Sequence, residues 1–141
     1  MDDVTIRPYE EADEEAVVAL WEETFPDSPH WNVPALDIAR KLSVQRELFF
    51  IAERDGRVVG TTMAGYDGHR GWVYYVAVAR PERGRGIGSA LMKRAEQGLR
   101  EAGCPKLNLM VRATNRDVVR FYESLGYLVE ERVCMAKRLE E

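Results

Sequence analysis

Three glycines at alternate positions, interleaved with arginines, mark the part of this sequence best suited to chemistry. They follow an apolar run over residues 72–79 and precede a helical pattern; the segment reads Arg83, Gly84, Arg85, Gly86, Ile87, Gly88 and Ser89. Glycine lets backbone N–H groups turn toward one point, and the first N–H groups of a helix are unpaired and partially positive. This arrangement is typical of a phosphate-binding site. The alternative is a plain loop, with glycine for turning and arginine for solubility.

Two familiar nucleotide motifs do not fit this spacing. A Walker loop requires a lysine directly after its last glycine, whereas Gly88 is followed by Ser89. A dinucleotide fingerprint requires GxGxxG within a βαβ unit. Here Gly84-x-Gly86 leads to Ser89, and three antiparallel strands are predicted before the loop.

Hydrophobic periodicity and turn residues predict the elements that must position this loop. Asp55-Gly56 and Asp67-Gly68 are hairpin signals, so the second, third and fourth strands are expected to run antiparallel. Gly103 is expected to end the third helix. Strands are predicted over 4–8, 48–53, 58–66, 72–78 and 107–111, with a final strand or strand pair over 127–139, and helices over 12–24, 35–45, 87–99 and 118–125.

Length and composition indicate one globular domain over residues 1–141. The chain is 45% hydrophobic and 31% charged, as is ordinary for a globular protein. Its longest apolar run, residues 72–79, is far shorter than the roughly 18 residues of a membrane span. The N-terminus is neither basic nor apolar, so no signal peptide is expected and a cytoplasmic protein is predicted. Cys104 and Cys134 lack CxxC spacing and are expected to be reduced, and with two histidines no metal site is predicted.

Charge is distributed unevenly along the chain. The net charge of −4 argues against a general nucleic-acid-binding protein. Residues 1–30 contain ten acidic residues and one basic residue, a net charge of −9, which leaves +5 for residues 31–141. The acidic part is interpreted either as a field that attracts a cationic substrate or as the solvated face of a helix.

The pattern Arg83-x-x-Gly86-x-Gly88 after a strand resembles the acyl-CoA motif of the GNAT superfamily of N-acetyltransferases. The resemblance covers essentially the whole chain, because further segments follow in that family's order and spacing. These are Ile6-Arg7-Pro8, the strand over 75–78, and Asn115 with Phe121-Tyr122 and Gly126-Tyr127. Residues 65–72 also resemble the small bacterial YpeA-type branch. The resemblance implies a mixed α/β (α+β) fold, with a mainly antiparallel sheet, helices on both faces, and fourth and fifth strands that splay apart.

The resemblance also implies acetyl-CoA as the co-substrate. The backbones of Val76 and Val78 are expected to pair with its pantetheine arm, as a peptide adds to an exposed strand edge, and one of their N–H groups to stabilise the oxyanion. The backbone from Arg83 to Ser89 is expected to hold the pyrophosphate. Asn115 resembles the asparagine that contacts the cofactor arm; the alternative is a simple helix N-cap.

Tyr122 stands where the family places its general acid, near the sulfur of the leaving thiolate. Tyrosine has a pKa near 10 and a thiol one near 8.5, so full proton transfer is uphill by roughly 2 kcal/mol. Tyr122 is therefore expected mainly to hydrogen-bond the departing sulfur. The alternative is a core aromatic residue, because Tyr122 shares a helix face with Val118 and Leu125.

Neither carboxylate that serves as general base in relatives is present. Related ribosomal-protein N-terminal acetyltransferases have Glu-Val-Arg where this chain has Met110-Val111-Arg112, and a glutamate of the fourth strand would fall near Trp72. Five side chains remain as reserves: Glu53, Asp67, His69, Tyr74 and Tyr75. A site without a strong base suits an α-amine, whose neutral form costs about 1.4 kcal/mol at pH 7, better than a lysine, at about 4.6 kcal/mol.

The predicted activity is acetyl transfer to a primary amine by direct attack in a ternary complex. The acceptor is a small molecule, a peptide N-terminus or a lysine, with no nucleic acid or membrane as partner. The alternative is a non-catalytic module that binds acyl-CoA as a sensor or interaction partner. Self-association as a homodimer through the last strand is left open.

Overall fold

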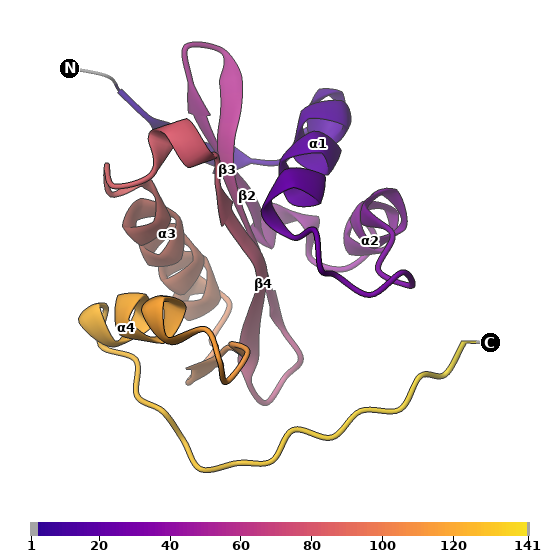
Figure 1. The fold of residues 1–141 in the computed structure, drawn as a ribbon, viewed down its shortest axis with the longest axis vertical. Helices are drawn as coiled ribbons and strands as arrows, with labels where there is room; N and C mark the ends of the chain where they lie inside the picture. The colour runs from indigo at the N-terminus through magenta and orange to yellow at the C-terminus, as the bar shows by residue number, and fades with distance from the viewer. Residues whose placement is uncertain (1–2, 141) are drawn as a thin grey trace. The chain divides into compact units, whose positions relative to one another are not determined.

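The computed structural model describes residues 3–140 and divides into two compact units, residues up to 109 and residues from 110 onward. The first unit holds a five-stranded sheet and the second holds helix α4 (Figure 1). The single domain expected over 1–141 stays a prediction. The strands are β1 Thr5–Pro8, β2 Phe49–Arg54, β3 Arg57–Tyr66, β4 Gly71–Val78 and β5 Leu107–Asn108; the α-helices are α1 Glu14–Thr24, α2 Pro34–Lys41, α3 Ile87–Glu101 and α4 Arg116–Ser124.

The sheet has the order β1-β2-β3-β4-β5, and its first four strands run antiparallel to their neighbours. Strand β5 runs parallel to β4 and pairs with it only at Gly71 and Trp72. Beyond Trp72, no strand of residues 3–140 pairs along that edge of β4. The mixed, mainly antiparallel sheet with splayed fourth and fifth strands is therefore confirmed.

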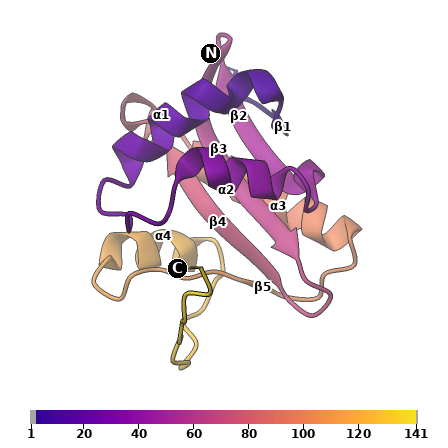
Figure 2. The same ribbon diagram turned by 90° about the vertical axis from the view of Figure 1, so that its right-hand side faces the viewer.

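Helices cover both faces of the sheet in the first unit. Helix α3 lies on one face, and α1 and α2 lie on the other (Figures 1 and 2). Strand β2 explains why both layers form: Phe49 and Ile51 pack in a buried cluster with Val17 and Trp21 of α1. Phe50, between them, faces α3, where the Arg94 guanidinium lies 4.6 Å from its ring centre. Successive side chains of a strand point to opposite faces, so a strand buried on both faces reads as an unbroken apolar run.

Most predicted boundaries agree with the structure, and the hairpin turns and the end of α3 are confirmed. Gly56, Gly68 and Gly103 all have positive φ, at 74°, 96° and 86°. The second predicted helix is shorter than expected, because α2 ends at Lys41. The following segment turns back, and its Gln45 side chain both donates to and accepts from the backbone of Tyr66.

The last predicted strand is wrong as a description of this structure. Residues 127–140 form neither helix nor strand, and five large apolar side chains there are 73–91% exposed: Leu128, Val129, Val133, Met135 and Leu139. The fifth strand is also two residues long instead of five. Alternating apolar residues favour a strand, but a strand forms only where a neighbour pairs with its backbone groups.

Candidate active site

The glycine loop has the backbone that its sequence predicts. Gly84 and Gly86 both have φ of +82°, in the left-handed region that favours glycine. A Cβ at either position would meet no atom within 4 Å, so the backbone conformation and not a lack of space requires glycine. Gly86 is the N-cap of α3 and provides no side-chain cap, and the first turn of α3 contains no acidic residue. The start of α3 is therefore open to an anion.

Charged side chains hold this loop against the sheet. Arg83 Nε donates a hydrogen bond to the backbone oxygen of Val78, at 3.0 Å. Glu82 is buried and forms an ion pair with Arg54 of β2, which lowers the pKa of Glu82. Arg85 lies 3.6 Å from the same carboxylate. Sequence reasoning missed Arg54 and Glu82, because an ion pair 28 residues apart leaves no periodic signal.

Strand β4 has backbone groups with no strand partner among residues 3–140 along the edge where its pairing with β5 stops after Trp72. Ala79 donates its N–H to the oxygen of Val59 at 2.8 Å, so residues 59 and 79 form a hydrogen-bonded pair. Such pairs alternate along an antiparallel ladder. The N–H of Val78, opposite Gly60, therefore points to the other edge of β4.

A β-bulge interrupts β4 directly before Val76. Opposite β3, the pairing shifts between Thr61, which faces Ala77, and Met63, which faces Tyr74. Tyr75 lies in the bulge with φ of +53°, a strained conformation for a residue with a side chain. Bulges increase the local twist of a strand, and the Tyr75 side chain packs on the α1 side of the sheet, as Ala77 does. The continuous apolar run over residues 72–79 gave no sign of this interruption.

An aromatic cavity lies where Tyr75 meets α1 and the segment between α1 and α2. Its volume is about 280 Å³, and Trp21, Phe25 and Tyr75 form its aromatic wall. The rings of Tyr75 and Trp21 stack with centroids 3.8 Å apart, and Phe25 meets Tyr75 edge-on at 5.7 Å. Glu22, Ser28, His30, Asn32 and three prolines of residues 26–34 complete the lining. The sequence had indicated only an irregular connection here.

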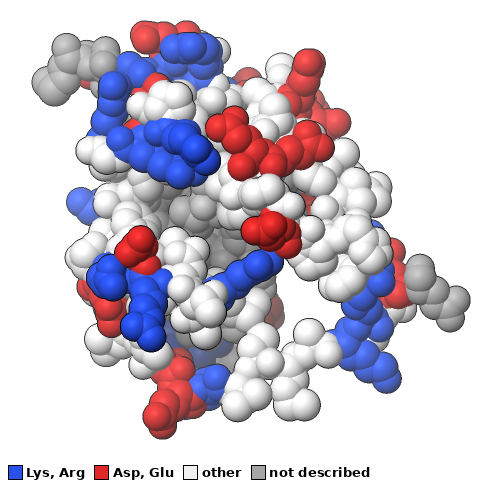
Figure 3. All heavy atoms as spheres, viewed as in Figure 1, with Lys and Arg blue, Asp and Glu red and all other residues white. Residues whose placement is uncertain are grey.

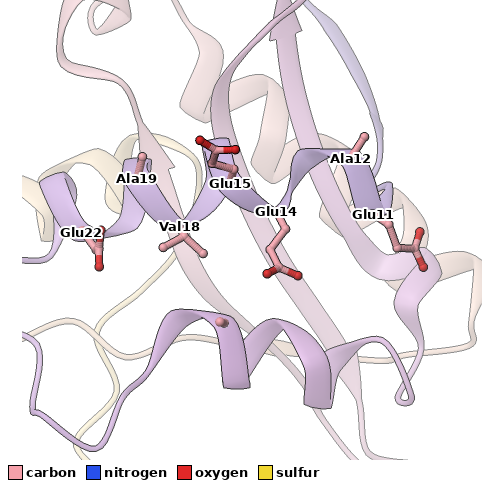
Figure 4. A pocket seen from close by; sticks show the side chains of 8 residues that line it. Glu11, Ala12, Glu14, Glu15, Val18, Ala19 and Glu22 are labelled. Atoms are coloured by element: carbon pink, nitrogen blue, oxygen red, sulfur yellow. The ribbon is translucent and has the colours of Figure 1, made fainter.

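An acidic hollow adjoins this cavity at Glu22, which lines both. The hollow has a volume of about 720 Å³ and lies along α1 beside Ala35 of α2. Glu14, Val18 and Glu22 point toward α2, and Glu15 points away from it (Figure 4). On the face shown in Figure 3, acidic side chains gather over α1 and basic ones gather over the segment that joins β4 to α3.

The reserve bases have different surroundings. Asp67 accepts the backbone N–H groups of His69 and Arg70 at 2.8 Å, which lowers the pKa of its carboxyl group. Glu53 forms an ion pair with Arg7 at 2.8 Å. Tyr75 differs from both, because it lines the aromatic cavity and its hydroxyl donates to Asp37 Oδ2 at 2.5 Å. Sequence reasoning missed Asp37.

The second unit contains Tyr122 and Asn115. Tyr122 is 8% exposed, and its ring meets Phe121 and Tyr127 edge-on, with centroids 5.0 and 5.7 Å away. Burial raises the pKa of Tyr122 to about 12. Asn115 is the N-cap of α4, and its side chain accepts the N–H of Val118 at 3.4 Å. The capping role weighed for Asn115 is therefore present, and contact with a cofactor stays a prediction, as does the role of Tyr122.

Two other kinds of feature are absent from the described residues. Within residues 3–140, no group of three or more His, Cys, Asp or Glu side chains is placed to hold a metal ion. In the same range, no helix is both long enough and apolar enough to span a membrane.

The mixed sheet, the bulged β4 and the glycine loop at the start of α3 define an acetyltransferase-like α/β fold. The Acetyltransferase (GNAT) family model matches residues 9–127, and the chain belongs to this family. The resemblance predicted from the sequence is confirmed.

Relatives agree over nearly the full length. An acetyltransferase of Yersinia enterocolitica is 47% identical over 134 residues, which cover 95% of this chain and 94% of the relative. An acetyltransferase of Pectobacterium atrosepticum is 47% identical over 136 residues, 96% of each chain. The structure of the aminoglycoside N-acetyltransferase AAC(6')-Iy in complex with CoA has the same fold, with a TM-score of 0.82, 19% identity, and coverage of 99% of this chain and 97% of that one.

Proposed function

We propose that this protein transfers an acetyl group from acetyl-CoA to a primary amine, by direct attack of the amine in a ternary complex. The observation that carries the proposal is the loop of Gly84 and Gly86, which has a left-handed backbone and leads into the start of α3. This loop follows β4, whose outer edge is not paired with β5 beyond Trp72. Membership of the acetyltransferase family supports the reaction. The aminoglycoside N-acetyltransferase of the same fold, which was solved with CoA, supports the donor.

In this proposal the chain binds acetyl-CoA mainly through backbone groups. The backbone of residues 83–89 holds the pyrophosphate, helped by the partial positive charge at the start of α3. Val78 offers its N–H to the pantetheine arm, because its oxygen already accepts from Arg83. The N–H of Val76 is the donor for the oxyanion that develops during attack. Asn115 is proposed to contact the cofactor arm.

Tyr122 is proposed to hydrogen-bond the departing sulfur. With a pKa of about 12, its hydroxyl stays protonated at neutral pH and serves as a donor. Complete proton transfer to a thiolate of ordinary pKa is then uphill by about 5 kcal/mol, which favours the hydrogen-bonding role. We expect no covalent acetyl-enzyme, because Cys104 and Cys134 belong to neither the loop nor the cavity.

The aromatic cavity is proposed as the acceptor site. Its aromatic wall and Glu22 suit a cationic amine, since ring faces and carboxylates both attract ammonium groups. The amine would approach from the α1 and α2 side, while the donor lies along the outer edge of β4. The proposal leaves three acceptor classes: small amines, peptide N-termini and lysines. A homodimer and a cytoplasmic location stay predictions.

Calorimetric titration with acetyl-CoA, followed by thiol release with a panel of amines, tests the proposal. The panel contains small amines, N-terminal peptides and lysine peptides. We expect saturable binding and thiol release with one of these classes. Binding without turnover across the panel would favour the non-catalytic sensor, and no binding would refute the assignment of the glycine loop.

A further inference from the structure

The proposed reaction needs a proton acceptor that the sequence did not provide. An acceptor amine arrives mainly as ammonium at pH 7. It loses two protons on its way to an amide, one of which ends on the leaving sulfur. The other must pass to the protein and then to water.

We propose that Tyr75 and Asp37 take this proton as a relay, in which the Tyr75 hydroxyl contacts the acceptor amine and Asp37 receives the Tyr75 proton. The inference rests on the proposed function. In the transfer, the N–H bond of the amine breaks while the Tyr75 oxygen gains that proton. The O–H bond of Tyr75 breaks in the same exchange, and its proton goes to Asp37 Oδ2. Tyr75 is thus the catalytic residue and Asp37 a positioning residue that acts through it.

The position of Tyr75 supports the first half of the relay. Tyr75 is the neighbour of Val76 in the chain, so its backbone adjoins the proposed oxyanion donor, and its side chain lines the acceptor cavity. Like Ala77, Tyr75 packs on the α1 side of the sheet, and its backbone has φ of +53° within the bulge. Stacking on Trp21 at 3.8 Å and the edge of Phe25 then fix the ring. A strained backbone held in place by packing is a recurrent feature of catalytic positions.

The surroundings of Asp37 support the second half. Asp37 lies on α2 and accepts the Tyr75 hydroxyl at 2.5 Å. Its side chain is 24% exposed, so a proton received there can pass to water. Arg40, on the same helix, lies 3.6 Å from its other oxygen, so the two oxygens of Asp37 have different partners.

Tyrosine alone would not serve as the base. Burial and the neighbouring Asp37 carboxylate raise the pKa of Tyr75, so its hydroxyl keeps its proton throughout the neutral range. It can accept a proton only while it passes its own to Asp37, which is why the pair is required. The other titratable groups at the cavity are Glu22 of α1 and His30 of the segment between α1 and α2. His30 is the rival base, because its imidazole belongs to the same cavity lining.

Three variants separate the relay from its rival. Tyr75→Phe keeps the stacked ring and removes the hydroxyl, Asp37→Asn keeps a hydrogen-bond acceptor and removes the basic group, and His30→Gln removes the imidazole. Tyr74→Phe is the matched control, because Tyr74 is the adjacent tyrosine of β4, is 48% exposed and lies outside the cavity lining. Thermal unfolding and the Kd for acetyl-CoA establish that each variant is folded and binds the donor.

We expect Tyr75→Phe and Asp37→Asn to lower kcat by about 100-fold or more, with a Kd for acetyl-CoA within about twofold of that of the unmodified protein. Tyr74→Phe should retain kcat within about threefold, and His30→Gln, which alters the cavity lining, should lower kcat less than either relay variant does. A loss confined to His30→Gln, or retained kcat in both Tyr75→Phe and Asp37→Asn, would overturn the relay.

The dependence of kcat/KM on the pKa of the acceptor amine distinguishes a base from a residue with a purely structural role. For the amine that the panel identifies and its β-fluorinated analogue of lower pKa, we compare kcat/KM. Loss of the base should raise the ratio of fluorinated to unfluorinated kcat/KM by about tenfold. This ratio does not depend on the folded fraction, so an unchanged ratio in both variants would refute the relay. If the unmodified protein acetylates no amine, the proposed function itself fails.

Discussion

Gly84 and Gly86 act through backbone conformation alone, so substituting either one tests whether the loop backbone binds phosphate. Both have φ of +82°, and a Cβ at either would meet nothing within 4 Å. Left-handed backbone costs a residue with a side chain roughly 1–2 kcal/mol. We therefore expect Gly84→Ala and Gly86→Ala each to weaken acetyl-CoA binding by about 5- to 30-fold in calorimetric titration. Gly68→Ala is the control, since Gly68 has φ of +96° with equally open space but lies in the turn between β3 and β4. An unchanged Kd in both loop variants would contradict a backbone phosphate site.

Tyr122 allows a second test on a single side chain. Removing only its hydroxyl, by Tyr122→Phe, should leave the Kd for acetyl-CoA unchanged and lower kcat by about 10- to 100-fold. Because its pKa is raised to about 12, Tyr122 ionises above the usual range, and we expect no fall in kcat from its ionisation up to pH 10. The same shift favours the protonated folded state, so stability from this group is lost as pH rises from about 10 through 12. A pH–rate profile of both proteins, with urea unfolding at each pH, measures this; equal kcat values would leave Tyr122 as a core aromatic residue.

At the scale of elements, the sequence predicts what local chemistry determines. Asp-Gly turns define the hairpins, and the spacing of apolar residues defines α1 and α3. The loop of Gly84 and Gly86 was predicted for the same reason, because glycine is the residue that most readily has positive φ. The bulge at Tyr75 was not predictable, since tyrosine rarely has positive φ and every residue of the run over 72–79 is apolar or aromatic. Asp37 was missed because its partner lies 38 residues away, and the strand over 127–139 was wrong because pairing depends on a neighbour.

Arg7 joins the first strand to two other segments, which gives a prediction about how elements are joined. Arg7 of β1 donates to Asp13 at 2.8 and 2.9 Å and to Glu53 of β2 at 2.8 and 3.0 Å. Its hydrogen bonds lower the pKa of Asp13. We expect Arg7→Met to reduce the free energy of unfolding by about 1–2 kcal/mol, measured by urea at pH 7. The contribution from Asp13 should be present above its unfolded pKa of about 3.9 and lost as pH falls through its lower folded pKa. Arg46→Met removes a similar but exposed pair with Glu11 and should change stability little. Equal losses in the two variants would contradict a special role for Arg7.

At the scale of the whole molecule, the acidic residues gather beside the proposed acceptor cavity, and the basic glycine loop lies at the proposed donor site. Residues 1–30 carry −9 and residues 31–141 carry +5, and acidic side chains line the hollow that meets the acceptor cavity at Glu22. If this field attracts the acceptor, raising the salt concentration from about 20 to 200 mM should increase KM several-fold more for a diamine than for a monoamine, because screening acts on each charge. Glu14→Gln, a substitution away from the aromatic wall, should reduce that difference and leave kcat unchanged. If the acidic residues only solvate α1, the two amines will show the same dependence on salt and Glu14→Gln will have no effect. Steady-state kinetics at two salt concentrations therefore decides between the two interpretations of the acidic segment.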